Sequence, residues 1–189
     1  MPPIIPILII IAVVLLIPLI WFIGNYNRLV RLRQHMQESW ADIDVELKRR
    51  YDLIPRLVNV CKGYADHERE TLERVIQLRN TALASTGRAS VQAADESNLM
   101  REMSRLFALV ENYPDLKADK QFLQLQHELA NTEDRIAAAR RFYNANVRDM
   151  KNMCEMFPSS IVANMMNFTA TDFFQLDSDA ERVVPRVNF

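Results

Sequence analysis

The chain has 189 residues, of which 49% are hydrophobic and 25% are charged, a size and balance typical of one folded domain with an appendage. Its formal net charge of -1 excludes bulk attraction of the whole chain to nucleic acid or to an anionic membrane, so any such binding must be local. Only three glycines occur, which excludes a glycine-rich phosphate loop or dinucleotide fingerprint and favours an all-helical protein.

The first element is an apolar run from Ile4 to Ile23 that contains no charged residue and is long enough to cross a bilayer. Nothing basic precedes this run, and no small-residue cleavage site follows it. We therefore expect residues 1–24 to form an uncleaved transmembrane anchor and not a signal peptide. A buried core helix is the alternative, but apolar side chains on every face argue against it.

Basic residues flank the apolar run on one side only. Arg28, Arg31 and Arg33 follow it closely, whereas no Lys or Arg precedes it. The positive-inside rule then predicts an N-terminus outside the cell and a cytoplasmic remainder. The same arginines are suited to contact lipid headgroups. The reverse orientation, with the remainder in the periplasm, is the alternative.

Helical periodicity continues from Tyr26 to Leu47, so we expect the anchor to run on into the first helix of a bundle. Pro55 lacks an amide donor and disfavours helix at the residue before it, which indicates a tight turn between two helices at Asp52–Pro55. A continuous helix kinked at Pro55 is the alternative, and the sequence does not decide between the two.

Two helices with one apolar face each are expected next, from Pro55 to about Leu83 and from about Ala94 to Asn112. The stretch between them, Ala84–Ser97, is rich in Ala, Ser, Thr and Gly without helical periodicity, which indicates a flexible connection. Pro114 then ends the third helix and opens the fourth.

The strongest helical pattern in the chain lies between Phe122 and Phe157. A heptad series of mostly apolar residues runs through it without interruption by Gly or Pro. A stripe of this length must be covered by several long helices, so we predict a four-helix bundle over residues 25–157. In the second half of the stripe the flanking positions also become apolar, and we expect additional cover there from the tail or from another subunit.

The C-terminal tail, residues 158–189, begins at Pro158, which ends the fourth helix. Apolar residues such as Ile161, Phe168 and Phe174 make it unlike a disordered segment. We expect it to pack back on the bundle or on a partner.

Polar and charged residues of both signs lie on helix faces that the periodicity makes internal or flanking. Because an unpaired buried charge is costly, we predict a network of interhelical ion pairs and hydrogen bonds that determines which helices pair. The candidate members are Asp44, Arg50, Glu68, Arg79, Glu133, Arg135, Arg140 and Asn146.

Catalytic and metal chemistry is not indicated by the remaining residues. Cys61 and Cys154 show no CxxC spacing, and His35, His67 and His127 take part in no HExxH or Glu-x-x-His motif. Acid–base catalysis needs convergent groups in a cleft, which no motif here provides. We therefore predict no catalytic residue, no metal site and no cofactor. A small-ligand-binding or enzyme-like bundle, with a pocket in or between its helices, is the alternative.

Several separate motifs closely resemble the LemA family. They are Tyr26-Asn27-Arg28-Leu29-Val30, the run IDVELKRRYDLIPRLVNVCKGYADHE at residues 43–68, residues 111–118, residues 132–144, and Phe157-Pro158. They occur in the expected order from the anchor to near the C-terminus. Cys61 is a departure, since the family usually has Val-Lys-Gly where this chain has Cys-Lys-Gly.

The resemblance implies a bacterial membrane protein with one N-terminal span and an antiparallel up-and-down four-helix bundle, similar in topology to the bromodomain-like group. Members of the family have no established enzymatic activity, and one branch resides in magnetosome membranes. We therefore expect a non-enzymatic scaffold or adaptor in the inner membrane, homo-oligomeric around its membrane end. Its expected partners are the lipid bilayer and a membrane-associated protein that the sequence does not name, and not nucleic acid.

Overall fold

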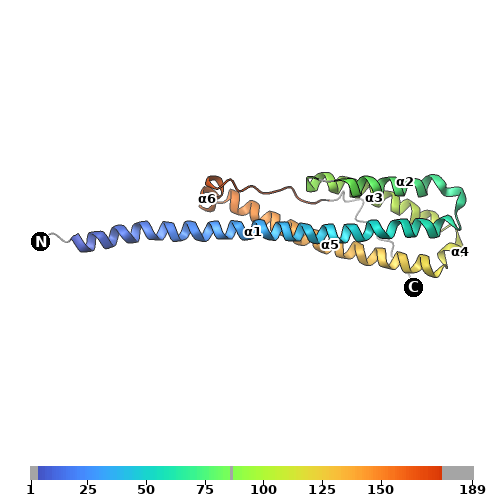
Figure 1. Ribbon diagram of the computed structural model, residues 1–189, viewed down its shortest axis with the longest axis horizontal. Coiled ribbons are helices and arrows are strands. Elements are labelled where there is room, and N and C mark those ends of the chain that lie inside the picture. Colours follow the sequence, from blue (N-terminus) through green and yellow to red (C-terminus); the bar gives the residue numbers. More distant parts are fainter. Residues whose placement is uncertain (1–3, 86, 176–189) are drawn as a thin grey trace. The chain divides into compact units, whose positions relative to one another are not determined.

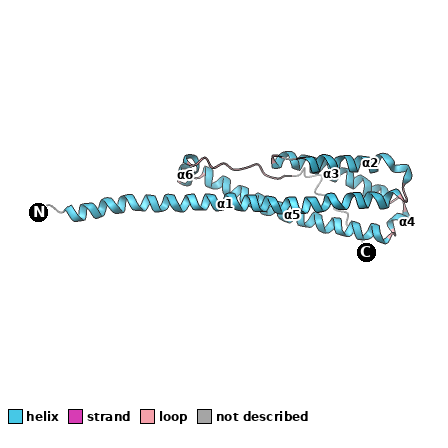
Figure 2. Cartoon of the chain, viewed as in Figure 1, coloured by secondary structure: helices cyan, strands magenta, loops and turns pink. Residues whose placement is uncertain are grey.

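The computed structural model describes residues 4–85 and 87–175, and the regular elements within these ranges are helical (Figure 1, Figure 2). The predicted all-α class is confirmed. The elements are α1 (Ile4–Lys62), the 3₁₀ helix η1 (Asp66–Glu68), α2 (Arg69–Ala84), α3 (Ala89–Val110), α4 (Pro114–Lys117), α5 (Lys120–Glu155) and α6 (Ser159–Met165).

The chain forms two compact units, and both α1 and α5 contribute residues to each of them. The first unit consists of residues 1–38 and 145–170, and the second of residues 39–144 and 171–189. The first therefore contains the apolar start of α1 together with α6, and the second contains α2, α3 and α4. The boundaries 1–24, 25–157 and 158–189 stay a prediction.

The apolar stretch at the start of α1 is not covered by the rest of the protein. Among the described residues, α1 is the one helix long and apolar enough to cross a membrane, and no part of its most apolar window is buried. Large side chains such as Ile10, Leu15 and Ile20 are all exposed. The core helix of a soluble domain would be largely buried, so this stretch has the exposure expected of a membrane span.

The rest of the first unit packs α1 against α5, α6 and the residues after α6. Its buried side chains are Leu29, Met36, Val147, Met150, Met153, Val162, Ala163 and Phe168. The Phe168 ring meets the Tyr26 ring edge-on, with 5.9 Å between centroids, and the Arg33 guanidinium lies 5.2 Å from its centre. The segment that follows α6 is thus held on α1.

In the second unit, α1 and α5 run in opposite directions. The Tyr64 hydroxyl, just beyond the end of α1, donates a hydrogen bond to Asp119 before the start of α5, at 3.2 Å. Earlier on α1, the Trp40 ring contacts the ring of Tyr143, late on α5, with 5.2 Å between centroids. Helix α2 packs against α3 after a short connection in which Gly87 has a φ of +146°, a value that favours glycine.

The predicted turn at Asp52–Pro55 is wrong, because α1 continues through it as one helix. Pro55 has no N–H to bond the carbonyl oxygen of Tyr51, four residues earlier. That oxygen instead accepts a hydrogen bond from Nε of Arg79 on α2, at 3.0 Å. A side chain from a neighbouring helix therefore replaces the missing backbone donor.

The first reversal of the chain follows the end of α1, at residues 63–65. The backbone N–H groups of Gly63 and Tyr64 donate to the carbonyls of Val60 and Cys61, at 3.2 and 3.1 Å, which tightens the last turn. The helix predicted from Pro55 to Leu83 is consequently divided between the end of α1, η1 and α2.

The predicted flexible connection at Ala84–Ser97 is too long, because α3 already begins at Ala89. Gln92 and Glu96 are buried and continue the inward-facing series of Leu99 towards the N-terminus. Because these two core positions are polar, the apolar periodicity does not reveal the first two turns of the helix.

The long fourth helix is confirmed as α5, with small differences at its ends. Pro114 opens the separate four-residue α4. Asp119 caps α5, since its Oδ1 accepts hydrogen bonds from the backbone N–H groups of Gln121 and Phe122, at 2.8 and 2.9 Å. Phe157, the last member of the predicted stripe, lies beyond α5 and is 81% exposed.

The described part of the tail contacts helices in each unit. Phe168 is buried in the first unit and Phe174 in the second. The Asn144 side chain holds Phe174 by two hydrogen bonds of 2.9 Å, one to its carbonyl oxygen and one from its N–H. The remaining apolar tail residues of the prediction, Leu176, Val183, Val184 and Phe189, lie outside the described residues.

Candidate functional site

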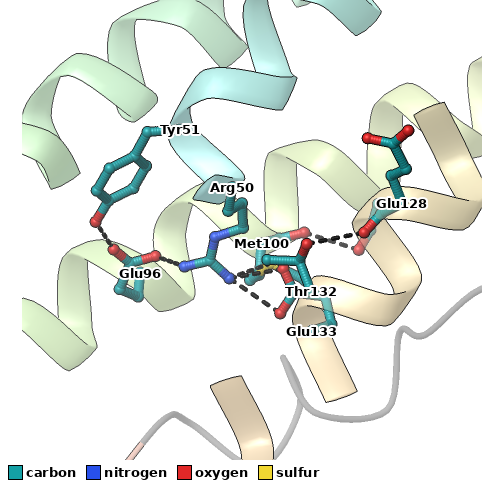
Figure 3. A network of polar contacts seen from close by, with 8 residues as sticks. Arg50, Tyr51, Glu96, Met100, Glu128, Thr132 and Glu133 are labelled. Atoms are coloured by element: carbon teal, nitrogen blue, oxygen red, sulfur yellow. Dashed lines mark hydrogen bonds and ion pairs between the residues drawn. The ribbon is translucent and has the colours of Figure 1, made fainter. Parts of the chain in front are cut away.

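The most concentrated polar chemistry of the second unit is a buried ionic cluster that joins three helices (Figure 3). Arg50 of α1 is 1% exposed and forms ion pairs with Glu96 of α3 and with Glu133 of α5. One terminal nitrogen of Arg50 lies 2.8 and 3.0 Å from the two carboxylate oxygens of Glu133, and it also contacts the Met100 sulfur at 3.3 Å. The other terminal nitrogen faces Glu96.

Helical geometry brings these three side chains together. Arg50 follows Ile43 and Leu47 on the buried stripe of α1, Glu96 precedes Leu99 on that of α3, and Glu133 is next to the buried Thr132 of α5. The planar guanidinium offers donors in two directions, so it serves two carboxylates at once. Lysine, a compact ammonium without the planar fork of the guanidinium, would not reproduce these two pairings.

Tyr51 extends the cluster on the side of Glu96. Its hydroxyl donates a hydrogen bond to Oε1 of Glu96, and both side chains are buried. Burial raises the pKa of the Tyr51 phenol, while the nearby Arg50 charge opposes that shift. The phenol therefore stays protonated and remains a donor to the carboxylate at neutral pH.

Asp44 lies one turn and a half before Arg50, at the edge of an open hollow of about 400 Å³. Partial burial raises the pKa of its carboxyl group, and hydrogen bonds with Gln92 and Trp40 oppose the rise. Lys48 and Tyr51 also line this hollow. Polar groups of α1 and α3, among them Asp44 and Gln92, therefore line one open hollow of the second unit.

Glu68 and Arg79 make separate contacts away from the cluster. Oε1 of Glu68 accepts a hydrogen bond from the Tyr113 hydroxyl at 3.1 Å, which joins η1 to the end of α3. Arg79 bonds the Tyr51 carbonyl and approaches Asp52 to 4.0 Å. Each of these pairs links two elements of the second unit.

Arg135 and Arg140 lie on α5 at two further contacts. Arg135 pairs with Glu46 of α1 at 3.5 Å, on an exposed part of the helix. The Arg140 guanidinium lies over the Phe174 ring, 5.7 Å from its centre. Of the predicted candidates, Arg50 and Glu133 come together in one cluster.

Asn146 belongs to the first unit, as do the arginines after the apolar stretch. Its Nδ2 donates to the His35 carbonyl oxygen at 3.3 Å, so it links α5 to α1. Arg28, Arg31 and Arg33 are all exposed, and the Arg33 guanidinium also stacks on the Phe168 ring.

Sequence reasoning missed Glu96 and Tyr51 of the cluster, together with Glu46 and Gln92. Glu96 lies where the predicted connection, Ala84–Ser97, overlaps the predicted third helix, and it was not named among the inward-facing residues. It nevertheless stands three residues before Leu99 and seven before Met103 in the same heptad register. That spacing is the signal that identifies it as an inward-facing residue of α3.

The arrangement is suited to holding helices in register and offers little for binding a cofactor. Every charge in the cluster faces an opposite charge, and the guanidinium and the Glu96 carboxylate lie away from solvent. Within residues 4–85 and 87–175 no group of three or more His, Cys, Asp or Glu side chains is arranged to hold a metal ion. A buried polar network of this kind specifies which helices pair and in which register.

Comparisons with known proteins match this chain to a family and to several relatives. The LemA family model matches residues 39–189. A protein named Protein LemA from Metamycoplasma hominis is 28% identical over 162 residues, covering 86% of this chain and 74% of that protein. Magnetosome protein MamQ from Magnetospirillum gryphiswaldense is 22% identical over 175 residues, covering 79% of this chain and 64% of that protein. MamQ 1 from Paramagnetospirillum magneticum is also 22% identical, with 80% of this chain and 65% of that protein covered.

The two magnetosome relatives are longer, so this chain spans less than two thirds of their length. The family model, in contrast, covers most of the chain, including every residue of the buried ionic cluster. The chain therefore belongs to the LemA family.

Proposed function

We propose that this protein is a non-enzymatic scaffold, anchored in the bacterial inner membrane by the start of α1, that organises a membrane-associated protein assembly. The observation that carries the proposal is the exposed apolar stretch of α1, which continues without a break into the helix that bears Arg50. One helix thus combines the properties of a membrane span with those of a bundle helix.

The second unit is proposed to be an antiparallel up-and-down four-helix bundle with bromodomain-like topology. The supporting observations are the opposite directions of α1 and α5, the packing of α2 on α3, and the Arg50 cluster that joins α1, α3 and α5. A rigid bundle of this type suits a scaffold, because its shape is fixed by internal ion pairs and not by a ligand.

The proposed orientation is supported by the charges beside the apolar stretch. Arg28, Arg31 and Arg33 lie directly after it on α1 and favour a cytoplasmic second unit. The inner membrane is proposed because the resemblance to the LemA family implies a bacterial protein with one N-terminal span, and α1 begins with an apolar stretch long enough to cross a bilayer.

A homo-oligomer is proposed because apolar side chains on α5 stay uncovered. Phe142 is 57% exposed in the second unit, beside the charged Arg141. Large exposed aromatic side chains of this kind are enriched at protein–protein interfaces. The name of the magnetosome relatives is in keeping with a role in an organised membrane assembly.

The proposal is tested by cross-linking the full chain in native membranes, followed by purification in mild detergent and identification of the proteins that co-purify. We expect cross-linked multimers of the chain and a reproducible membrane-protein partner. A chain that remains monomeric at all expression levels and retains no other protein would overturn the scaffold. A Phe142→Asp variant tests the interface: it should lose the cross-linked multimers, while Leu123→Asp, at another exposed position of α5, should keep them.

A further inference from the structure

The junction between α5 and α6 carries a group of exposed apolar side chains, here named the α5–α6 corner. Its members are Met156, Phe157, Ile161, Met165 and Met166. The opposite face of the same junction is buried through Ser159, Val162 and Ala163. The junction is therefore amphipathic, and the apolar face that points outwards is not covered by any part of the chain that the structure describes.

The contacts within the first unit place this corner near the end of the apolar stretch of α1. Asn146 on α5 bonds the His35 carbonyl on α1, and the chain then runs on along α5 towards Phe157. Eleven residues separate Asn146 from Phe157, which lies two residues beyond the end of α5, and eleven residues before His35 on α1 is Gly24, about 16 Å away along that helix. Gly24 directly follows the apolar stretch.

A second contact confirms this register independently. Phe168, just after α6, packs edge-on against Tyr26 of α1, two residues beyond Gly24. Its backbone N–H donates to the Ala163 carbonyl at 2.9 Å, which holds the end of α6 beside this part of α1 (Figure 1). The corner and the end of the apolar stretch therefore lie at the same level in the first unit.

The residues around this level have the chemistry of a membrane interface. Trp21 and Tyr26 occupy the boundary of the apolar stretch, where aromatic side chains are enriched in membrane proteins. Arg28 and Arg31 are exposed one to two turns further along α1, at the depth where phosphate headgroups would follow. Phe, Ile and Met side chains on a short amphipathic helix are suited to the acyl boundary between them.

We propose that the α5–α6 corner is a second membrane contact, which inserts into the interfacial zone of the same bilayer that α1 crosses. This second contact rests on the proposed membrane anchor. Together the two contacts would fix the angle at which the first unit stands on the bilayer, because a single helix leaves this angle free.

The test uses the full chain in lipid nanodiscs that contain brominated lipids, which quench tryptophan emission at close range. The corner is probed by Phe157→Trp and, separately, by Met165→Trp, each with Trp21→Phe and Trp40→Phe. The matched control is Gln34→Trp in the same background, an exposed position of the first unit eleven residues beyond Ile23. Native Trp21, with Trp40→Phe alone, reports the anchor itself.

We expect both corner probes to lose about half of their emission or more, because interfacial side chains lie about 5–10 Å deep, within reach of the bromine atoms. Trp21 should be quenched as strongly, and Gln34→Trp should be quenched little. Quenching of Trp21 without quenching of either corner probe would overturn this inference and leave the anchor intact. Equal quenching of the Gln34→Trp control would also overturn it, whereas an unquenched Trp21 would overturn the anchor.

Discussion

At the residue scale, Arg50 shows how a buried charge is accommodated in a helical core. Its guanidinium is almost entirely removed from water, and its two carboxylate partners come from helices that are distant in sequence. The attraction between the charges offsets a large desolvation cost, so the net contribution of the intact cluster to stability is modest. Removing one member is far more damaging, since it leaves the others buried without a counter-charge.

We therefore predict that Arg50→Met lowers the free energy of unfolding by about 3–5 kcal/mol. Methionine fills similar space but leaves the Glu96 and Glu133 carboxylates unpaired. Arg49→Met, at the exposed neighbouring position, should change stability by less than about 0.5 kcal/mol. Urea unfolding in detergent, followed by circular dichroism, measures both variants. Equal stability of Arg50→Met and wild type would contradict a structural role for the cluster.

Arg79 illustrates a different residue-scale device, the repair of a helix at a proline. Its Nε bonds the Tyr51 carbonyl that Pro55 leaves without a backbone donor. We predict that Arg79→Met costs about 1 kcal/mol in the natural background, because that carbonyl loses its partner. In a Pro55→Ala background the new N–H replaces it, and the cost of Arg79→Met should largely disappear.

The double-mutant cycle measures this coupling directly, with an expected interaction energy of about 1 kcal/mol. Thermal unfolding of the four proteins provides the data. Additive effects of the two substitutions would show that Arg79 and Pro55 act independently.

At the scale of elements, α5 owes its sharp start to Asp119. The carboxylate accepts two backbone hydrogen bonds from the first turn of the helix and one from the Tyr64 hydroxyl. The bond from the Phe122 backbone, followed by those from the Tyr64 hydroxyl and the Gln121 backbone, lowers the pKa of Asp119 below its usual value of 3.8, against a smaller opposing effect of desolvation. A carboxyl group with a lowered pKa stabilises the folded state above its unfolded pKa, and this contribution is lost as the pH falls through the folded pKa.

We accordingly predict that wild type loses stability relative to Asp119→Asn as the pH is lowered below 3.8. Asparagine keeps an oxygen acceptor for the cap but does not titrate. Asp119→Ala, which has no acceptor, should unfold at a lower temperature than Asp119→Asn at every pH. Melting temperatures of the three proteins between neutral and acidic pH test this, and a constant gap between wild type and Asp119→Asn would refute it.

At the same scale, the end of α1 and the start of α3 were both predicted incorrectly. Local propensity placed a turn at Pro55, but a side chain from α2 supplies the missing hydrogen bond and the helix continues. Composition placed a loop before Ser97, but Glu96 is buried against Arg50 and the helix starts earlier. In both places a contact with another helix overrode the local signal.

At the scale of the whole molecule, the proposed orientation in the membrane depends on the arginines that follow the apolar stretch. Positive charge beside a membrane span is usually retained on the cytoplasmic side, and Arg28, Arg31 and Arg33 follow the stretch closely. Exposure of Arg28 and Arg31 leaves their charges available to lipid headgroups.

We predict that replacing the three arginines by glutamine produces a mixture of orientations, whereas replacing them by lysine preserves a cytoplasmic C-terminus. A C-terminal reporter pair, one active in the cytoplasm and one in the periplasm, measures the distribution. Arg33→Gln alone is the control for the lost stacking on Phe168 and should keep the wild-type orientation. Periplasmic activity of the unaltered chain would reverse the proposed topology.

The sequence by itself determined the all-α class, the apolar stretch at the start of α1 and the course of α5. These features can be predicted from local periodicity and composition, because they do not depend on contacts with distant residues. It also identified Arg50 and Glu133 as cluster candidates, because charges on an apolar stripe require partners. Only the tertiary structure decided which partners they have, that α1 passes through Pro55, and that Glu96 belongs to the core of α3. Each of these depends on a side chain from another helix, and no local pattern encodes that contact.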